Sequence, residues 1–309
     1  MMNRQEFLKS IALAGAAAAL FSEGASDVLA QGEAGRTPDL VAVMGGEPDT
    51  MFATAIKQMG GIGRFVKKGQ KVCIKPNIGW DKTPELAANT NPLLVATLVK
   101  ACLAAGASEV VVFDHTCDDW RRSYETSGIA EAVEKAGGKM MPGNEPQYYR
   151  LISFPRAKNM KTARVHQAIL DSDVWINMPV LKTHSGAKMT ICMKNLMGIV
   201  EDRRFFHTND LHQCIADICT IDPPPVLNIV DAYRVLKSNG PRGRDANDVV
   251  KPQALFMSTD IVAIDTAASK FFNGIVPMPL ENLTFLAHGE ELGVGTMDLN
   301  SLKIKRVKL

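Results

Sequence analysis

The sequence predicts an α/β fold, in which a mostly parallel sheet carries helices on both faces as three layers. Short, fully apolar segments alternate with segments of helical spacing, glycines or prolines separate them, and 46% of the 309 residues are hydrophobic. Strands that are apolar along their whole length are typical of parallel sheets buried on both sides. A chain of this size is long enough for one large domain or for two closely joined lobes.

The predicted elements follow one another with short connections. Pro92 and Gly106 bracket one helix, and Asp260 is placed to cap another. Residues 140–164 are less regular and are expected to form a hairpin or an excursion from the sheet. The tail 302–307 alternates apolar residues with Lys and Arg, as an edge strand does. We expect strands near 40–44, 71–75, 109–113, 173–177, 226–230 and 254–257, and helices over 50–59, 92–105, 126–136, 208–221, 261–272 and 280–288.

The first thirty residues have the features of an export signal. Basic residues precede an Ala-rich apolar run, and small residues at 28–30 suit a signal peptidase. The run has about half of the roughly 20 residues that a transmembrane helix needs. Phe7, Leu8 and Lys9 match part of a twin-arginine signal, although Gln5 occupies the position of its second arginine. The degenerate signal predicts a periplasmic or otherwise exported protein without a transmembrane segment in the mature chain.

The predicted domain organisation follows from these segments. It consists of a signal peptide over 1–30, a flexible leader over 31–38 and a single α/β domain over 39–309.

Positive charge is concentrated in residues 177–198, just after a predicted buried strand. Lys182, His184, Lys188 and Lys194 lie there, and no acidic residue occurs between Asp173 and Glu201, although the net charge is only +2. This segment therefore predicts a site for an anionic ligand. Residues 188–200 have helical spacing, and the methionines among them are interpreted as core residues rather than as a copper site. A helix that began near residue 185 would also offer backbone N–H groups to the anion.

Polar residues follow several predicted strands. In open parallel sheets, ligands bind outside the carboxyl ends of the strands, so these residues are expected to converge. A single Asp or Asn in such a place also fits a turn or a helix cap. The candidates for catalysis are His184, Lys182, Lys194 and Asp114, and the candidates for ligand binding are Lys75, Asn77, Thr183, Asn195 and Asp231.

His184 is the candidate that moves a proton. An unperturbed histidine has a pKa of about 6.5, which suits a general acid or base, and its ring can also bind a metal. The neighbouring lysines are expected to disfavour its protonation and to keep it neutral.

Several classes of function are excluded by composition and motifs. A net charge of +2 and an aromatic content of 6% do not fit a nucleic-acid-binding protein. The chain contains no dinucleotide, nucleotide, nucleophile-elbow or zincin motif. Its six cysteines form no Cys-x-x-Cys pair and no ferredoxin or zinc-ribbon spacing. The cofactor is therefore left unknown: a metal or an iron–sulfur cluster stays open, without a ligand motif in the chain.

Five segments of the chain carry a resemblance to a known family. They are Val72-Cys73-Ile74-Lys75-Pro76-Asn77, Leu181-Lys182-Thr183-His184, Lys194-Asn195-Leu196-Met197-Gly198, Asp231 with Gly240-Pro241, and residues 258–265. In this order, from about residue 40 to residue 274, they resemble the family called domain of unknown function 362. The resemblance implies that other members often carry an attached ferredoxin-type iron–sulfur module, which is not recognisable in these residues, and that some have twin-arginine signals.

The first hypothesis is an exported protein that binds a small anionic molecule, carrying a carboxylate or a phosphate, in a Lys/His/Asn cleft. Acid/base chemistry at His184 would suit proton transfer next to a carbonyl or carboxylate, acyl transfer or phosphoryl transfer. The alternative is a metal- or iron–sulfur-linked accessory with a redox protein partner. Its ligands would be His184 with Asp114 or His115, and Cys192 or Cys117. A receptor that binds without chemistry is the third hypothesis.

Overall fold

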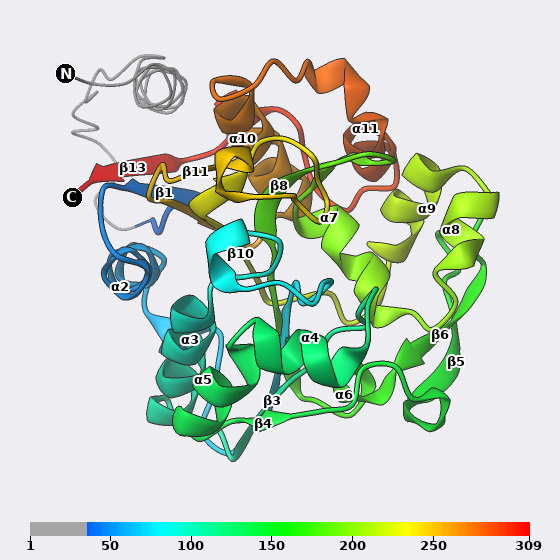
Figure 1. The fold of residues 1–309 in the computed structure, drawn as a ribbon, viewed down its shortest axis with the longest axis horizontal. Helices are drawn as coiled ribbons and strands as arrows, with labels where there is room; N and C mark the ends of the chain where they lie inside the picture. Colours follow the sequence, from blue (N-terminus) through cyan, green and yellow to red (C-terminus); the bar gives the residue numbers. More distant parts are fainter. Residues whose placement is uncertain (1–35) are drawn as a thin grey trace.

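The computed structural model describes residues 36–309. The predicted signal peptide and residues 31–35 of the predicted leader lie outside this range. The described residues form an eleven-stranded sheet with helices on both of its faces, together with a separate two-stranded sheet (Figure 1). The predicted α/β fold with a mostly parallel sheet is therefore confirmed.

The main sheet is parallel over one half and mixed over the other. From β4 to β10 each strand runs parallel to its neighbour, whereas β12 runs antiparallel to both β10 and β1. β13 pairs with β1 at the sheet edge, as predicted for the tail. Along the sheet the strands are β4 (Lys139–Met140), β3 (Glu109–Val112), β2 (Lys71–Pro76), β7 (Val174–Met178), β10 (Leu227–Leu236), β12 (Ala254–Ser258), β1 (Leu40–Met44) and β13 (Ile304–Lys308).

Alternate residues of the strands feed two separate hydrophobic cores. In β1, Leu40 and Ala42 belong to one core, whereas Val41 and Val43 belong to the other. The second core is covered by α2 (Pro48–Gln58), α3 (Pro92–Ala104), α4 (Trp120–Thr126) and α5 (Ile129–Lys135). The first core is covered by α6 (Gln167–Leu170), α7 (Cys192–Asn195), α9 (Leu211–Ile218), α10 (Ile261–Asn273) and α11 (Thr284–Glu291).

The irregular region 140–164 contains the first strand of a hairpin, which is one of the two predicted outcomes. Its strands are β5 (Tyr149–Ser153) and β6 (Thr162–His166), and they pair antiparallel outside the main sheet. The hairpin packs against the first core through Val165, which is fully buried.

The predicted helix over 188–200 is wrong in its first part. Residues 180–190 form a hairpin of β8 (Val180–His184) and β9 (Lys188–Thr190), and the helical turns begin only at Cys192, with α7 and the 3-10 helix η4 (Leu196–Ile199). The Asp265 carboxylate accepts hydrogen bonds from the backbone N–H groups of Cys192 and Met193, which fixes the helix start there. Strand pairing therefore overrides the helical spacing, and the predicted anion site at a helix start near residue 185 is lost.

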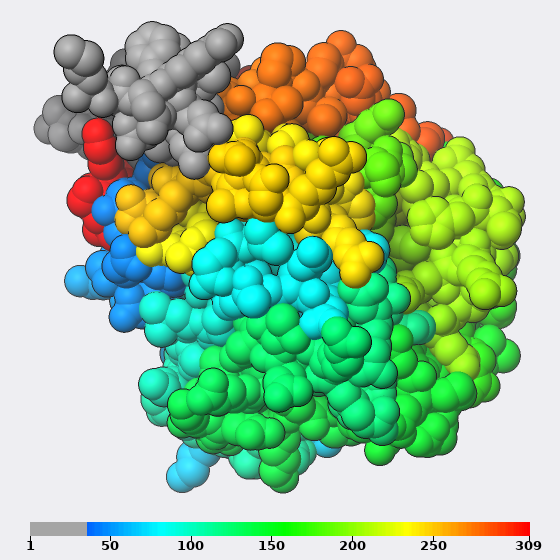
Figure 2. Space-filling view, viewed as in Figure 1, coloured from blue at the N-terminus to red at the C-terminus, as the bar shows by residue number. Residues whose placement is uncertain are grey.

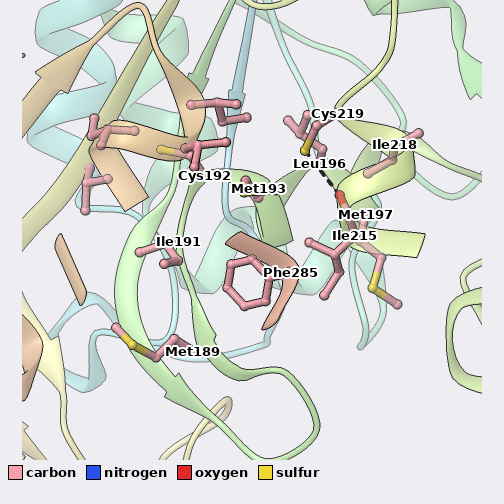
Figure 3. Packing of buried hydrophobic residues seen from close by; sticks show 14 of the residues in the cluster. Met189, Ile191, Cys192, Met193, Leu196, Met197, Ile215, Ile218, Cys219 and Phe285 are labelled. Carbon is pink, nitrogen blue, oxygen red and sulfur yellow. Dashed lines mark hydrogen bonds between the residues drawn. The ribbon is translucent and has the colours of Figure 1, made fainter. Parts of the chain in front are cut away.

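The sulfur-containing residues of this segment do pack into the core, as predicted. Figure 3 shows Met189, Cys192 and Met193 among buried aliphatic side chains and Phe285. Each of these four side chains is fully buried.

The strand predicted to end at Asp231 continues to Leu236. β11 (Val249–Val250) and β8 both pair with its second half, which supplies the hydrogen bonds for the extension. The loop that follows returns over the sheet, and its 3-10 helix η5 (Ala246–Asp248) packs on η2 (Pro84–Leu86). On the surface, this yellow loop lies against the cyan segment (Figure 2).

None of the helices between residues 36 and 309 combines the length and hydrophobicity that crossing a bilayer requires.

Candidate functional site

A cavity of about 280 Å³ opens where the ends of β2, β3 and β8 meet α7 and α8 (Arg204–Thr208). Six stretches of the chain contribute to it, which is the convergence predicted for the strand-end residues. Its lining consists of Lys75, Asn77, Gly79, Trp80, Asp114, His115, Cys117, Lys182, His184, Thr190, Lys194, Asn195, Met197, Gly198, Arg203, Arg204, His207 and Pro241.

A buried ion pair forms part of the cavity lining. Lys75 Nζ lies 2.6 Å from Asp114 Oδ1, and the two side chains are 0% and 2% exposed. The other carboxylate oxygen accepts a hydrogen bond from the backbone N–H of Ile78 at 2.7 Å. Burial lowers the pKa of Lys75, and the charge of Asp114 opposes that shift. Asp114 thus supplies the counter-charge that a buried ammonium needs.

Gly198 makes room for this pair. A Cβ atom at residue 198 would lie 2.1 Å from Asp114 Oδ1 and 2.7 Å from Lys75 Nζ. Both distances are shorter than any van der Waals contact, so the ion pair requires glycine at residue 198.

Asn195 connects the cavity lining to the strands beneath it. Its Oδ1 accepts hydrogen bonds from Lys75 Nζ at 3.0 Å and from Asn77 Nδ2 at 3.2 Å. Its Nδ2 donates to Asn177 Oδ1 on β7 at 2.9 Å. The amide therefore orients residues from β2, β7 and α7 together.

Lys182 is a buried cation that is held by neutral oxygens. Its Nζ donates to Asn77 Oδ1 at 2.8 Å and to the carbonyl oxygen of Ala88. Burial, together with the charge of Lys194, lowers the pKa of Lys182 to about 7. A ligand that brought a negative charge to this amine would favour its protonated form.

Lys194 on α7 also lines the cavity, and its side chain is partly exposed. Its Nζ contacts Met197 Sδ at 3.1 Å. Burial lowers the pKa of Lys194 to about 8, with the cations Arg203 and Lys75 acting in the same direction and Cys117 opposing them.

His184 adopts a single neutral tautomer. Its Nδ1 accepts hydrogen bonds from the backbone N–H groups of Gly186 at 3.1 Å and Ala187 at 3.2 Å. The ring proton must therefore be on Nε2. Burial and the charges of Lys194 and Lys182 lower the pKa of His184 to about 2. The ring is thus neutral, as expected, but its lone pair is occupied, which argues against the predicted acid/base role and makes His184 a hydrogen-bond donor.

His115 has the opposite tautomer. Its Nδ1 lies 2.9 Å from the carbonyl oxygen of Val200, which can only accept, so Nδ1 carries the proton and Nε2 keeps a lone pair. Burial lowers the pKa of His115, and the adjacent Arg203 acts in the same direction. Of His115 and His184, His115 is therefore the one with the tautomer of a base.

Sequence reasoning missed Arg203 and Arg204, which add two cations to the lining. Arg203 donates to the backbone oxygens of His115 at 3.0 Å and Thr116 at 2.6 Å, so it is fixed to the loop after β3. The two arginines directly follow Glu201 and Asp202, and such a mixed charge run is typical of a solvated surface. A pair of adjacent arginines close to the basic segment was the available signal.

Two predicted ligand-binding residues lie outside the cavity lining. Thr183 follows Lys182 on β8, so the two side chains point to opposite faces of the strand. The Thr183 hydroxyl is oriented towards the carbonyl oxygen of Lys188. Asp231 lies within β10 rather than at its end, and it accepts the backbone N–H groups of Asn91 and Tyr233. Burial raises the pKa of Asp231 to about 6. Neither residue is therefore part of the lining, and the exposed Lys188 is not part of it either.

The side chains of the described residues do not fit a protein-bound metal ion. Within 36–309, no three His, Cys, Asp or Glu residues come together as a ligand set. Cys192 is buried in the core and is absent from the cavity lining, whereas Cys117, His115 and Asp114 do line it. Asp114 already carries an ion pair with Lys75. No chemical step is therefore derived through a metal or an iron–sulfur cluster.

Fold and cavity together define an α/β protein with an electropositive site at the carboxyl ends of parallel strands. The chain belongs to the family described as domain of unknown function (DUF362), whose model matches residues 72–270. The match contains every residue of the cavity lining, from Lys75 to Pro241.

Two known proteins are similar over most of this chain. The thylakoid-associated protein sll1697 of Synechocystis sp. is 27% identical over 267 residues, which cover 80% of this chain and 81% of that protein. The structure of the lactate racemase apoprotein from Thermoanaerobacterium thermosaccharolyticum matches with a TM-score of 0.48 and 11% identity. That match covers 76% of this chain and 57% of the racemase chain, so it spans little more than half of the racemase.

Proposed function

We propose that the cavity binds a small anion that carries a carboxylate or a phosphate group. The observation that supports this most strongly is the imbalance of charge in the lining. Lys182, Lys194, Arg203 and Arg204 line the cavity, whereas Asp114, the carboxylate among its described lining residues, already pairs with Lys75. Unpaired cations around a partly buried cavity attract anions and bind them more strongly than the same charges in water.

The lining also offers directional contacts to such an anion. The arginines suit two-point contacts with a carboxylate or phosphate, and the neutral His184 donates from Nε2 without adding charge. The volume of about 280 Å³ lies just below the range of typical small-molecule sites, which is roughly 300–1,000 Å³. A small metabolite-sized ligand therefore fits better than a nucleotide.

We propose that residues other than His184 transfer protons in this cavity. An acid/base group works best when its pKa lies near the working pH. Lys182 and Lys194, with pKa values of about 7 and 8, meet this condition, and His115 has a free Nε2. We therefore propose that any acid/base chemistry uses these residues, while His184 orients the ligand.

We also propose that the protein acts after export from the cytoplasm. This proposal is supported by the predicted signal peptide over residues 1–30 and by its partial twin-arginine pattern at Phe7, Leu8 and Lys9.

Two lysines on the same hairpin provide the test of anion binding. Lys182 lines the cavity, whereas Lys188 is exposed and points elsewhere. Calorimetric titration with sulfate, phosphate and malonate at pH 6 compares Lys182→Met with Lys188→Met. Loss of a charged hydrogen bond of about 1.5–3 kcal/mol predicts a 10-fold or greater loss of affinity in the first variant. In the second variant the affinity should stay within about twofold.

Circular dichroism and thermal melting would confirm that both variants are folded. Equal affinities in the two variants, or no binding of any of the three anions by the unmodified protein, would show that the cavity is not an anion site.

A further inference from the structure

We propose that Lys194 is a nucleophilic amine, which forms a reversible imine with the carbonyl carbon of an anionic aldehyde or 2-oxo acid. This inference rests on the proposed anion-binding function of the same cavity, and it narrows the ligand to anions that also carry a reactive carbonyl group.

The three lysines of the lining differ in what their amines contact. Lys75 Nζ faces a carboxylate at 2.6 Å, and Lys182 Nζ donates to two amide oxygens. Lys194 Nζ contacts the thioether sulfur of Met197 at 3.1 Å and has no oxygen acceptor among residues 36–309. An ammonium group carries three N–H donors, and a thioether is only a weak acceptor. Within the described protein, the charged form of Lys194 therefore has only this weak acceptor, and its remaining N–H groups face the partly exposed cavity.

The neighbouring cations act in the same direction as burial, whereas Cys117 and Asp114 oppose them. Arg203 and Lys75 lie close enough to oppose a further positive charge at Lys194, and the carboxylate of Asp114 is engaged by Lys75. A lysine that is desolvated and placed next to another cation is activated as a nucleophile, because its free amine is populated at neutral pH. A pKa of about 8 leaves roughly a quarter of the amine uncharged at pH 7.5, compared with about 0.1% for an ordinary lysine.

The backbone holds this amine in a fixed place. Asp265 caps α7 through Cys192 and Met193, and Asn195, the next residue after Lys194, is tied to β2 and β7. Lys194 itself is partly exposed and lines the cavity. The cations Lys182, Arg203 and Arg204 can hold the anionic group while the carbonyl carbon lies against Lys194.

The step is balanced without a co-reactant. The Nζ lone pair attacks the carbonyl carbon, and the carbonyl oxygen takes up a proton to give a carbinolamine. This oxygen then leaves as water while the carbon–nitrogen double bond forms. The net change is amine plus carbonyl to imine plus water, with no oxidation or reduction. Lys182, whose pKa is about 7, is the adjacent group that can supply the proton for the leaving water.

Reductive trapping with glyoxylate tests this proposal. The full-length protein is incubated with glyoxylate and sodium cyanoborohydride at pH 8, and peptide mapping by mass spectrometry locates carboxymethyl-lysine. We expect Lys194 to be modified about 10-fold faster than Lys188, the exposed lysine on the neighbouring hairpin, because far more of its amine is uncharged. Sulfate should slow the modification of Lys194 but not that of Lys188, and neutral acetaldehyde should show a smaller preference.

Lys194→Arg keeps the positive charge but removes the nucleophile. In this variant the selective adduct should disappear, while circular dichroism should show that the fold is kept. If the unmodified protein binds sulfate but Lys194 reacts no faster than Lys188, the imine is wrong and the anion site stands. If the unmodified protein binds none of sulfate, phosphate and malonate, both the anion site and the imine are wrong.

Discussion

Replacing Asp114 with Asn should destabilise the protein strongly, although the two side chains have nearly the same shape. The substitution removes one charge of the buried pair with Lys75. The amide can turn its oxygen towards the N–H of Ile78 or towards Lys75, but not towards both. One donor therefore faces another donor in a site that is closed to water.

The magnitude follows from the geometry of the pair. At an effective dielectric constant of about 20, unit charges 2.6 Å apart attract by about 6 kcal/mol, which the desolvation of both groups offsets in part. Removing one partner of such a pair costs about 3–5 kcal/mol. Lys75 keeps hydrogen bonds to Asn195 Oδ1 and to the carbonyl oxygen of Pro76, so we expect about 3 kcal/mol, at the lower end.

Urea unfolding at pH 7, followed by tryptophan fluorescence, measures this loss. Trp175 is fully buried and reports on the centre of the sheet. The matched control is Glu109→Gln, which breaks partly exposed ion pairs with Lys71 at 3.1 Å and Lys139 at 2.8 Å. Pairs of this kind contribute about 0–1 kcal/mol, so the control should unfold close to the parent midpoint.

Two further observations distinguish a buried bare charge from a simple packing defect. Adding Lys75→Met to Asp114→Asn should recover part of the lost stability, because no charge is then left buried. The stability difference between the Asn variant and the parent should also become smaller as the pH rises. In the variant, the folded form releases the Lys75 proton that the unfolded chain keeps, so a higher pH favours the folded form. If Asp114→Asn costs no more than Glu109→Gln, the pair does not hold this part of the site together.

Two other predictions concern ligand affinity and export. The affinity for sulfate should fall as the pH rises from 6 to 9, because Lys182 and Lys194 lose their protons near pH 7 and 8. Bound sulfate stabilises the ammonium forms, which displaces this fall to higher pH. A titration series that shows constant affinity would contradict these roles. The mature protein should begin near Gln31; N-terminal sequencing that finds Met1 retained would contradict the export proposal.

The fold was predictable from the sequence because each element repeats a strong local pattern. Apolar strands such as 71–75 and 109–113 end at Gly, Pro or charged residues, and the observed strands lie within a residue or two. The cap at Asp260 was also correct: its carboxylate accepts from the N–H groups of Val262 and Ala263. Local chemistry alone determines such features.

The errors occurred where a distant contact outweighs the local pattern. The helical spacing of residues 188–191 is overridden by pairing with β8, and the helix start at Cys192 is set by Asp265, more than seventy residues away. Asp231 was misplaced because pairing with β8 and β11 carries its strand past it. Neither partner can be recognised from the residues next to the error in the chain.

Most residues of the candidate site could be located because ligands bind at the carboxyl ends of parallel strands. The role of each residue could not be predicted in this way. Lys75, Asn77, Asp114, Lys182, His184, Lys194 and Asn195 do converge. The tautomers of His184 and His115 depend on backbone contacts, at Gly186 with Ala187 and at Val200, and the first of these occupies the lone pair that the predicted base at His184 needs. Spacing therefore predicts that residues meet, whereas hydrogen-bond partners decide what each one can do.

The partners of the three lysines also indicate where an anion would bind. Lys75 is neutralised by Asp114, so a second anion gains little from it. Lys182 and Lys194 contact only uncharged partners among the described residues, and both pKa values are lowered, so each would regain charge when an anion approaches. Binding there is coupled to proton uptake at pH 8, because without ligand Lys182 is mostly neutral and Lys194 about half neutral at that pH. Proton uptake measured by calorimetry in buffers of different ionisation enthalpy would therefore distinguish this half of the cavity from the Lys75–Asp114 half.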